Sequence, residues 1–312
     1  MKKIDKLFKE FPELSIMESW IRKTVASSKF HPVKNVYKRY TQRNPKHFDL
    51  AITTLKNPNS EWNKRWWADM YITHFFWGTA LFSYLNNNFA ILKKIPNHIK
   101  LFDKLKNKEQ FFDTISEIEF NAYFGKRYRI ELEPRINYEQ TKYKELDSKI
   151  FLSSRPIYVE IMTPKMNRRL LHTSKAIALN NRSKNKILDK LDRQIIPIKD
   201  KLRCPLIIVI NSSHSEMGET EVEDAILGQS QLTLTINTNT GQTIDIRPSR
   251  DSNSVSQARP QSSCISAVLI YKSLIKPGYI SCTKSLILNT NADYPLTKKE
   301  YKALNRFNLS NI

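Results

Sequence analysis

The feature that most constrains the fold is the stretch 117–165, in which acidic side chains recur inside otherwise apolar segments. Successive side chains of a β-strand point to opposite faces of a sheet. This alternation predicts a strand over 157–162 that carries Glu160, and a second strand over 146–152 that carries Asp147. If the two strands pair, their carboxylates can converge on one face of the sheet.

A helix is expected before these strands, and it bears Glu117 and Glu119. Only one of the two can point towards a sheet, and the sequence leaves open which one. Buried carboxylates are costly unless they are paired or hold a metal ion. A helix Glu together with Asp147 and Glu160 would form an oxygen-rich site suited to Mg²⁺ or Mn²⁺. The alternative, in which Asp147 and Glu160 form ion pairs with Arg or Lys side chains, stays open.

The order of these elements resembles the core of the PD-(D/E)XK nuclease superfamily, which has the restriction-endonuclease-like fold. The resemblance covers approximately the segment 112–290 and runs through a helix with Glu, a strand, a strand with Asp and a strand with Glu. It implies metal-dependent hydrolysis of phosphodiester bonds in nucleic acid. The positions that match the superfamily's metal ligands are Glu117 or Glu119, Asp147 and Glu160.

The chain departs from the superfamily's pattern at two positions. The superfamily has a Lys two residues after the last acid, which helps to activate water, whereas this chain has Met162 there; Leu146 stands where a Pro precedes the Asp. A thioether carries no charge. The missing cation could come from Lys149, which shares a strand face with Asp147, or from Lys165, which follows the same strand as Met162. Two functions therefore stay open: a nuclease, and a nuclease-fold protein that binds nucleic acid or acts as a scaffold without cleavage.

The rest of the chain predicts two regions. Residues 1–108 show helical spacing of apolar side chains and no strand alternation, so an all-α region is expected there. Residues 109–312 predict a mixed α/β domain, in which a restriction-endonuclease-like mixed sheet is flanked by helices. Further strands are expected over 128–133, 206–210, 231–236, 243–246, 265–271 and 285–288, and a terminal helix over 296–312.

The net charge of +21 favours a polyanionic partner, with nucleic acid first and DNA favoured over RNA. Cations are concentrated over 165–203, directly after the strand of Glu160. One interpretation is that they neutralise phosphates, and the other is that they form a solvated helix face. The candidate nucleic-acid contacts are Arg168, Arg169, Lys175, Arg182 and Lys184.

Three widely spaced cysteines without a CxxC pair predict neither a disulfide framework nor a zinc ribbon, and they favour a reducing, cytoplasmic compartment. The most apolar segment, 66–85, is interrupted by Asp69 and His74 and predicts a buried helix rather than a membrane span. No membrane partner is expected. The oligomeric state stays open, with a dimer as one option.

Overall fold

The computed structural model describes most of the chain, and its residues fall into two compact units. The described residues are 3–42, 45–61, 63–64, 80–164, 189, 191–214, 230–236, 243–250, 263–276, 279–289 and 292–309. The first unit comprises 1–132, 273–283 and 307–312, and the second comprises 133–272 and 284–306. The boundary expected after residue 108 falls inside the first unit.

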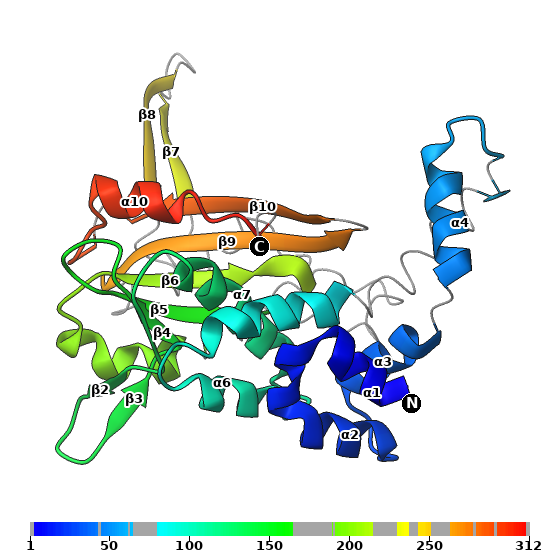
Figure 1. The fold of residues 1–312 in the computed structure, drawn as a ribbon. Helices are drawn as coiled ribbons and strands as arrows, with labels where there is room; N and C mark the ends of the chain where they lie inside the picture. The colour runs from blue at the N-terminus through cyan, green and yellow to red at the C-terminus, as the bar shows by residue number, and fades with distance from the viewer. Residues whose placement is uncertain are drawn as a thin grey trace. The chain divides into compact units, whose positions relative to one another are not determined.

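The described residues up to 108 form helices and turns, as the sequence predicts (Figure 1). Three of these helices begin at Pro12, Pro32 and Pro45, where the fixed φ of proline suits the first helical position and its missing N–H leaves no hydrogen bond unmade. The helices are α1 (Lys3–Glu10), η1 (Pro12–Met17), α2 (Glu18–Ala26), α3 (Pro32–Gln42), α4 (Pro45–Lys56), the helix over 80–92, and α6 (His98–Lys104).

The core of the first unit is built around α7 (Phe111–Gly125), in which Phe111 and all residues from Thr114 to Phe124 are buried. Aromatic side chains from the earlier helices fill this core, and the ring centroids of Phe89 and Phe102 lie 4.2 Å apart. Each fully buried Phe contributes about 1.5–3 kcal/mol relative to an exposed one. Packing on α7 therefore supplies the stability that short helices lack by themselves.

The sheet has six strands in the order β1-β4-β5-β6-β9-β10. The β4 strand pairs antiparallel with β5, whereas β5 with β6 and β6 with β9 pair in parallel, so the sheet is mixed as predicted. All six residues of β6 are buried, in keeping with the continuous apolar run of this segment. The strands are β1 (Ile130–Leu132), β4 (Ser148–Ile150), β5 (Ile157–Met162), β6 (Leu206–Asn211), β9 (Ile265–Lys276) and β10 (Tyr279–Leu288).

Several predicted bounds need correction. The strand expected over 146–152 is limited to Ser148–Ile150, so Asp147 precedes the strand instead of lying inside it. The strand expected over 285–288 is the second part of the longer β10 at one edge of the sheet. Of the terminal helix expected over 296–312, the structure forms α10 (Lys298–Leu304).

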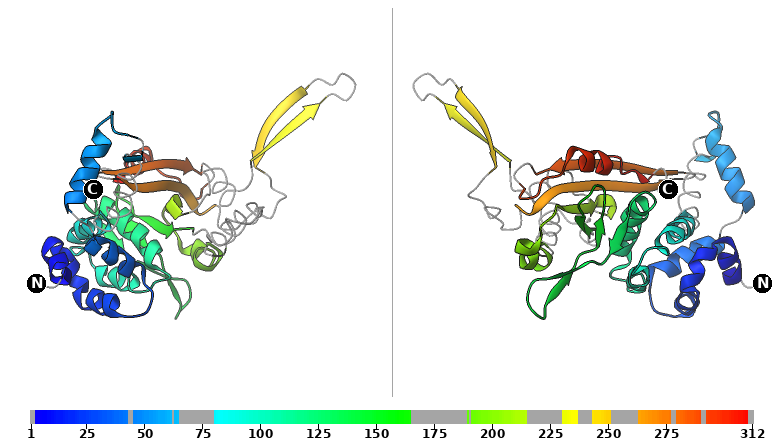
Figure 2. Two further views of the ribbon diagram at one scale, coloured as in Figure 1. Left: turned by 90° about the vertical axis from the view of Figure 1, so that its right-hand side faces the viewer. Right: turned by 60° about the vertical axis from the view of Figure 1, so that its left-hand side comes forward.

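Among the described residues, two hairpins form outside the six-stranded sheet. The predicted one joins β7 (Ser230–Ile236) and β8 (Thr243–Arg250), which pair antiparallel (Figure 2). The other, β2 (Arg135–Asn137) with β3 (Tyr143–Glu145), was not predicted from the sequence. Arg135 stabilises it, because its Nε lies 2.9 Å from Oε1 of Glu145 and its guanidinium stacks 4.6 Å from the ring centroid of Tyr143.

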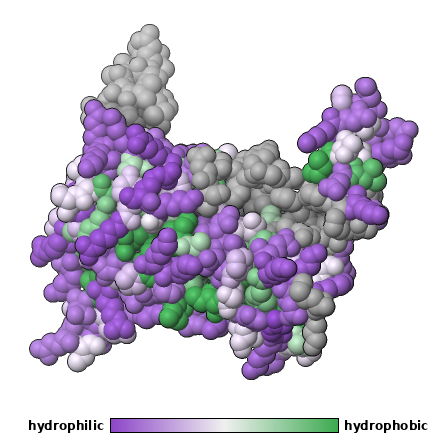
Figure 3. Space-filling view, viewed as in Figure 1, coloured by the Kyte–Doolittle hydropathy of each residue, from purple (hydrophilic) through white to green (hydrophobic). Residues whose placement is uncertain are grey.

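The surface drawn in Figure 3 is mainly hydrophilic, with hydrophobic residues in small separate areas. Scattered apolar residues of this kind are normal on protein surfaces. Within the described part of the chain, no helix combines the length and the apolar character needed to cross a membrane.

Candidate metal and nucleic-acid site

The pairing of β4 with β5 brings Asp147 alongside Glu160. Ser148 lies opposite Val159, so continuing the antiparallel register by one residue places Asp147 opposite Glu160. Residues that lie opposite each other in an antiparallel pair share a face of the sheet. The carboxylate of Asp147 reaches the next position of β5, where its Oδ2 accepts a hydrogen bond of 2.6 Å from the backbone N–H of Ile161.

The backbone of Asp147 is held from its other side by the turn between β1 and β2. The N–H of Glu133 donates to the carbonyl of Asp147 at 3.1 Å, and the N–H of Leu146 donates to the carbonyl of Pro134 at 3.3 Å. Glu133 has a φ of 51°, a left-handed conformation that costs a non-glycine residue about 1–2 kcal/mol. The two backbone hydrogen bonds hold Glu133 in this strained conformation, and they fix the backbone of Asp147.

Glu160 is buried in an apolar environment, with 1% of its surface exposed. It pairs with Ile208 of β6 and shares its sheet face with Met162. Both of these neighbours belong to the apolar cluster that also contains Leu191 and Ile195. Two carboxylates that lie close together repel each other, so a bound cation between them would be stabilising.

Lys149 lies on the same face of the sheet as the two acids. It is opposite Tyr158 in the register, and Tyr158 precedes Glu160 by two residues. The Lys149 ammonium lies 5.8 Å from the ring centroid of Tyr158 and 5.5 Å from that of Phe151. The two aromatic rings lie beside the ammonium on the side of the sheet that carries the acids.

The two helix acids have different environments, both within the first unit. Oε2 of Glu117 forms an ion pair of 2.9 Å with Nζ of Lys104 on α6. Glu119 lies near Tyr84, whose pKa is raised well above its usual value, first by burial and then by the negative charge of Glu119. The helix acids thus have partners of their own, and the acids of the sheet belong to the second unit.

Among the described residues, no group of three or more His, Cys, Asp or Glu side chains could hold a metal ion. The pair of Asp147 and Glu160 is the part of the expected ligand set that one unit brings together. Carboxylate oxygens from two neighbouring strands fit a hard divalent cation that retains several water ligands, which is how Mg²⁺ is usually bound.

The predicted nucleic-acid contacts and Lys165 lie outside the described residues. This holds for Arg168, Arg169, Lys175, Arg182 and Lys184.

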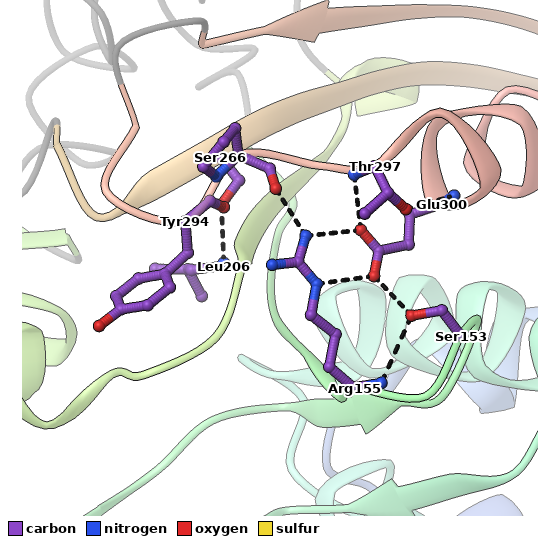
Figure 4. Close-up of polar contacts among 8 residues, drawn as sticks. Ser153, Arg155, Leu206, Ser266, Tyr294, Thr297 and Glu300 are labelled. Atoms are coloured by element: carbon purple, nitrogen blue, oxygen red, sulfur yellow. Dashed lines mark hydrogen bonds and ion pairs between the residues drawn. The ribbon is translucent and has the colours of Figure 1, made fainter.

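Sequence reasoning missed an ion pair to a buried carboxylate that fixes the loop between β4 and β5. Arg155 in this loop contacts both carboxylate oxygens of Glu300 on α10, with Nε–Oε1 and Nη2–Oε2 distances of 2.9 and 2.8 Å (Figure 4). Ser153 donates to Oε1 at 2.6 Å, and the backbone N–H of Thr297 donates to Oε2 at 2.7 Å. The carbonyl of Pro295 accepts a further hydrogen bond from Arg155 at 2.6 Å. We call these five residues the Glu300 cluster.

The segment before α10 is also tied to the middle of the sheet. Ser266 of β9 donates to the carbonyl of Tyr294 at 2.6 Å and accepts a hydrogen bond of 3.2 Å from the N–H of Leu206 (Figure 4). The loop between β4 and β5 is therefore connected to α10 through Glu300, and the segment before α10 is connected to β9 and β6 through Ser266.

The pKa of Glu300 makes the stability of the fold depend on pH. Burial alone would raise this pKa, but the hydrogen bonds from Arg155, Ser153 and Thr297 lower it from 4.5 to about 2. A carboxyl group with a lowered pKa in the folded state stabilises the fold above its unfolded pKa, and this stabilisation is lost as pH falls towards 2.

We therefore expect Glu300→Gln to lower the free energy of unfolding at pH 7, and we expect this loss relative to wild type to become smaller as pH falls below 4.5. Urea unfolding of both proteins between pH 7 and pH 3 measures the difference, which should reach about 3 kcal/mol at neutral pH. Other carboxyl groups titrate equally in both proteins, so the difference isolates Glu300. A difference that does not change with pH would contradict the assigned pKa.

Comparisons with known proteins found no matching family model, no matching curated protein and no matching solved structure.

Proposed function

We propose that this protein is a metal-dependent nuclease of the PD-(D/E)XK type, which hydrolyses phosphodiester bonds in DNA. The order of its elements supports this proposal. After α7, the strands that enter the six-stranded sheet are β1, β4 and β5, with the β2–β3 hairpin between β1 and β4, and these three strands are neighbours in the sheet in the same order. The next strand, β6, pairs in parallel with β5. The PD-(D/E)XK resemblance of the sequence implies a mixed sheet with this succession of a helix and three strands.

The observation that carries the proposal is the position of Asp147 opposite Glu160, on one face of the sheet. These two carboxylates would hold Mg²⁺ or Mn²⁺, and a bound ion supplies a water of lowered pKa and charge that stabilises the reacting phosphate. Asp147 is fixed by the hydrogen bond that it accepts from Ile161. Its carboxylate is therefore held in place before any ligand binds, which reduces the reorganisation that binding requires.

The Lys149 ammonium is the candidate for the charge that Met162 cannot provide. Met162 is 4% exposed and packs in the apolar cluster with Ile208, so no polar group stands at this position. A cation on the face of Asp147 can stabilise hydroxide and the negative charge that develops on phosphate. Lys165 remains the second candidate for this role.

The direct test is the nicking of supercoiled plasmid by the purified protein, with Mg²⁺ or Mn²⁺ and with EDTA. We expect conversion to open-circular and linear DNA with either metal ion and none with EDTA. Folded protein that leaves the plasmid intact with every divalent ion would contradict the proposal.

The assignment of the cation leads to a separate prediction. Lys149→Met should slow cleavage by about 10- to 100-fold, because it removes one favourable charge from the site, whereas Lys149→Arg should retain more activity. Initial nicking rates and the thermal unfolding midpoint are measured for both variants. If Lys149→Met cleaves at the wild-type rate and Lys165→Met does not, the role belongs to Lys165 instead.

A second function is favoured by Met162 itself. A protein that kept this fold without the catalytic Lys would bind nucleic acid and not cleave it. Salt-sensitive DNA binding in EDTA, combined with intact plasmid under every metal condition, would support this function over the first.

A further inference from the structure

A second basic surface lies in the first unit, at the turns that follow the helix 80–92 and α7. The first of these turns, residues 93–97, lines a surface hollow of about 430 Å³ together with the first residues of α6. The second turn, residues 126–129, contains three cationic side chains within four positions. Neither turn belongs to the acid pair described above, and the sequence patterns did not single out either of them.

Close packing brings the two turns together. A methyl group placed on Gly125, at the end of α7, would come within 3.0 Å of Cδ1 of Ile95 and 3.5 Å of Cγ2 of Ile91. The side chain of Asn97 donates a hydrogen bond of 3.1 Å to the carbonyl of Leu132, just beyond the second turn. Asn97 has a φ of 68°, which an Asn tolerates better than most residues. The two turns therefore form one continuous surface.

Lys94, Lys126 and Arg127 are among the exposed cations of this surface. We call these three residues the turn patch. The neighbouring Lys93 is 2.7 Å from Oε2 of Glu13, so a carboxylate already offsets its charge. The Arg127 guanidinium lies 5.0 Å from the ring centroid of Tyr123, a contact that limits the orientations the side chain can adopt. The turn patch thus presents three positive charges to solvent.

We propose that the turn patch binds the phosphate backbone of duplex DNA. Duplex DNA carries one negative charge per about 1.7 Å of helix axis, so a surface that presents several cations side by side can neutralise several phosphates at once. The net charge of +21 draws a polyanion towards the molecule, and the turn patch gives it a local point of contact. This binding does not require that the protein cleaves DNA.

The test compares two triple variants of the full chain that lose the same charge. One is Lys94→Gln, Lys126→Gln and Arg127→Gln, and the control is Lys6→Gln, Lys9→Gln and Lys56→Gln, three exposed lysines of the same unit. Affinity for a fluorescently labelled DNA duplex of about 30 base pairs is measured by anisotropy in EDTA, over about 50 to 200 mM salt. Thermal unfolding verifies that both variants fold.

We expect the turn-patch variant to bind the duplex at least about tenfold more weakly. The slope of log affinity against log salt concentration should become less steep by about 2 to 3. The control should lose less than about threefold, because its three lysines lie outside the two turns that form the proposed contact. Equal losses in both triples, or a wild-type protein that does not bind the duplex, would overturn this inference. Plasmid cleavage by the wild-type protein is scored separately, so the proposed function stands or fails independently of the turn patch.

Discussion

Asp147→Asn is expected to abolish plasmid cleavage, with a loss of at least about 100-fold in initial rate. The amide keeps the size of the side chain but lacks the negative charge that attracts a divalent ion. Its oxygen can still accept the hydrogen bond from the N–H of Ile161, which Oδ2 of Asp147 accepts in the structure. The variant should therefore fold with nearly the wild-type unfolding midpoint, and Glu160→Gln should show the same loss of rate.

The control for this prediction is Glu139→Gln. Glu139 is an exposed acid of the second unit that pairs with Lys142 at 2.8 Å. Its neutralisation changes the net charge by the same amount as Asp147→Asn and should leave cleavage within about twofold of wild type. Wild-type rates in a correctly folded Asp147→Asn protein would remove Asp147 from the chemistry.

The second large effect is on stability. Arg155→Met should lower the free energy of unfolding by about 3–5 kcal/mol, because it leaves the carboxylate of Glu300 buried without its guanidinium partner. Glu300 has no exposed surface in the folded protein, so its carboxylate depends on its protein partners for stabilisation. Urea unfolding at pH 7 measures the change, and Lys299→Ala, an exposed position of the same helix, is the matched control.

A double variant separates this cause from a general packing defect. Arg155→Met with Glu300→Leu removes both charges, so it should be more stable than Arg155→Met alone. Since the Glu300 cluster fixes the loop between β4 and β5, the single variant should also lower cleavage when measured well below its unfolding midpoint. A double variant that is less stable than either single variant would contradict this interpretation.

Local periodicity predicted the strands whose burial is uniform or alternates clearly. The strand Ile157–Met162 has the predicted bounds, and the run at Leu206–Asn211 reads as a strand buried on both faces. The β2–β3 hairpin was missed because each of its strands has three residues, too few for a period to show. Asp147 was predicted to lie inside a strand because the alternation of polar and apolar residues continues beyond the last residue that pairs in the sheet. The strained turn at Glu133 cannot be deduced from the sequence.

Contacts between residues far apart in the sequence are the part of the candidate site that could not be predicted. Arg155 and Glu300 are 145 positions apart, and the sequence around Glu300 predicts only a terminal helix and not this ion pair. In the structure, Thr297 and Glu300 form a capping box at the start of that helix. Conversely, the convergence of Asp147 and Glu160 was predictable, because strands that are close in the sequence and joined by a short loop usually pair.

The most direct test of the central claim is anomalous diffraction from crystals soaked in Mn²⁺. We predict an anomalous peak at about 2.0–2.2 Å from carboxylate oxygens of both Asp147 and Glu160. Crystals of Asp147→Asn, soaked in the same way, should lack this peak. A wild-type map with manganese bound elsewhere, or with no peak between these two side chains, would contradict the metal site and the nuclease function built on it.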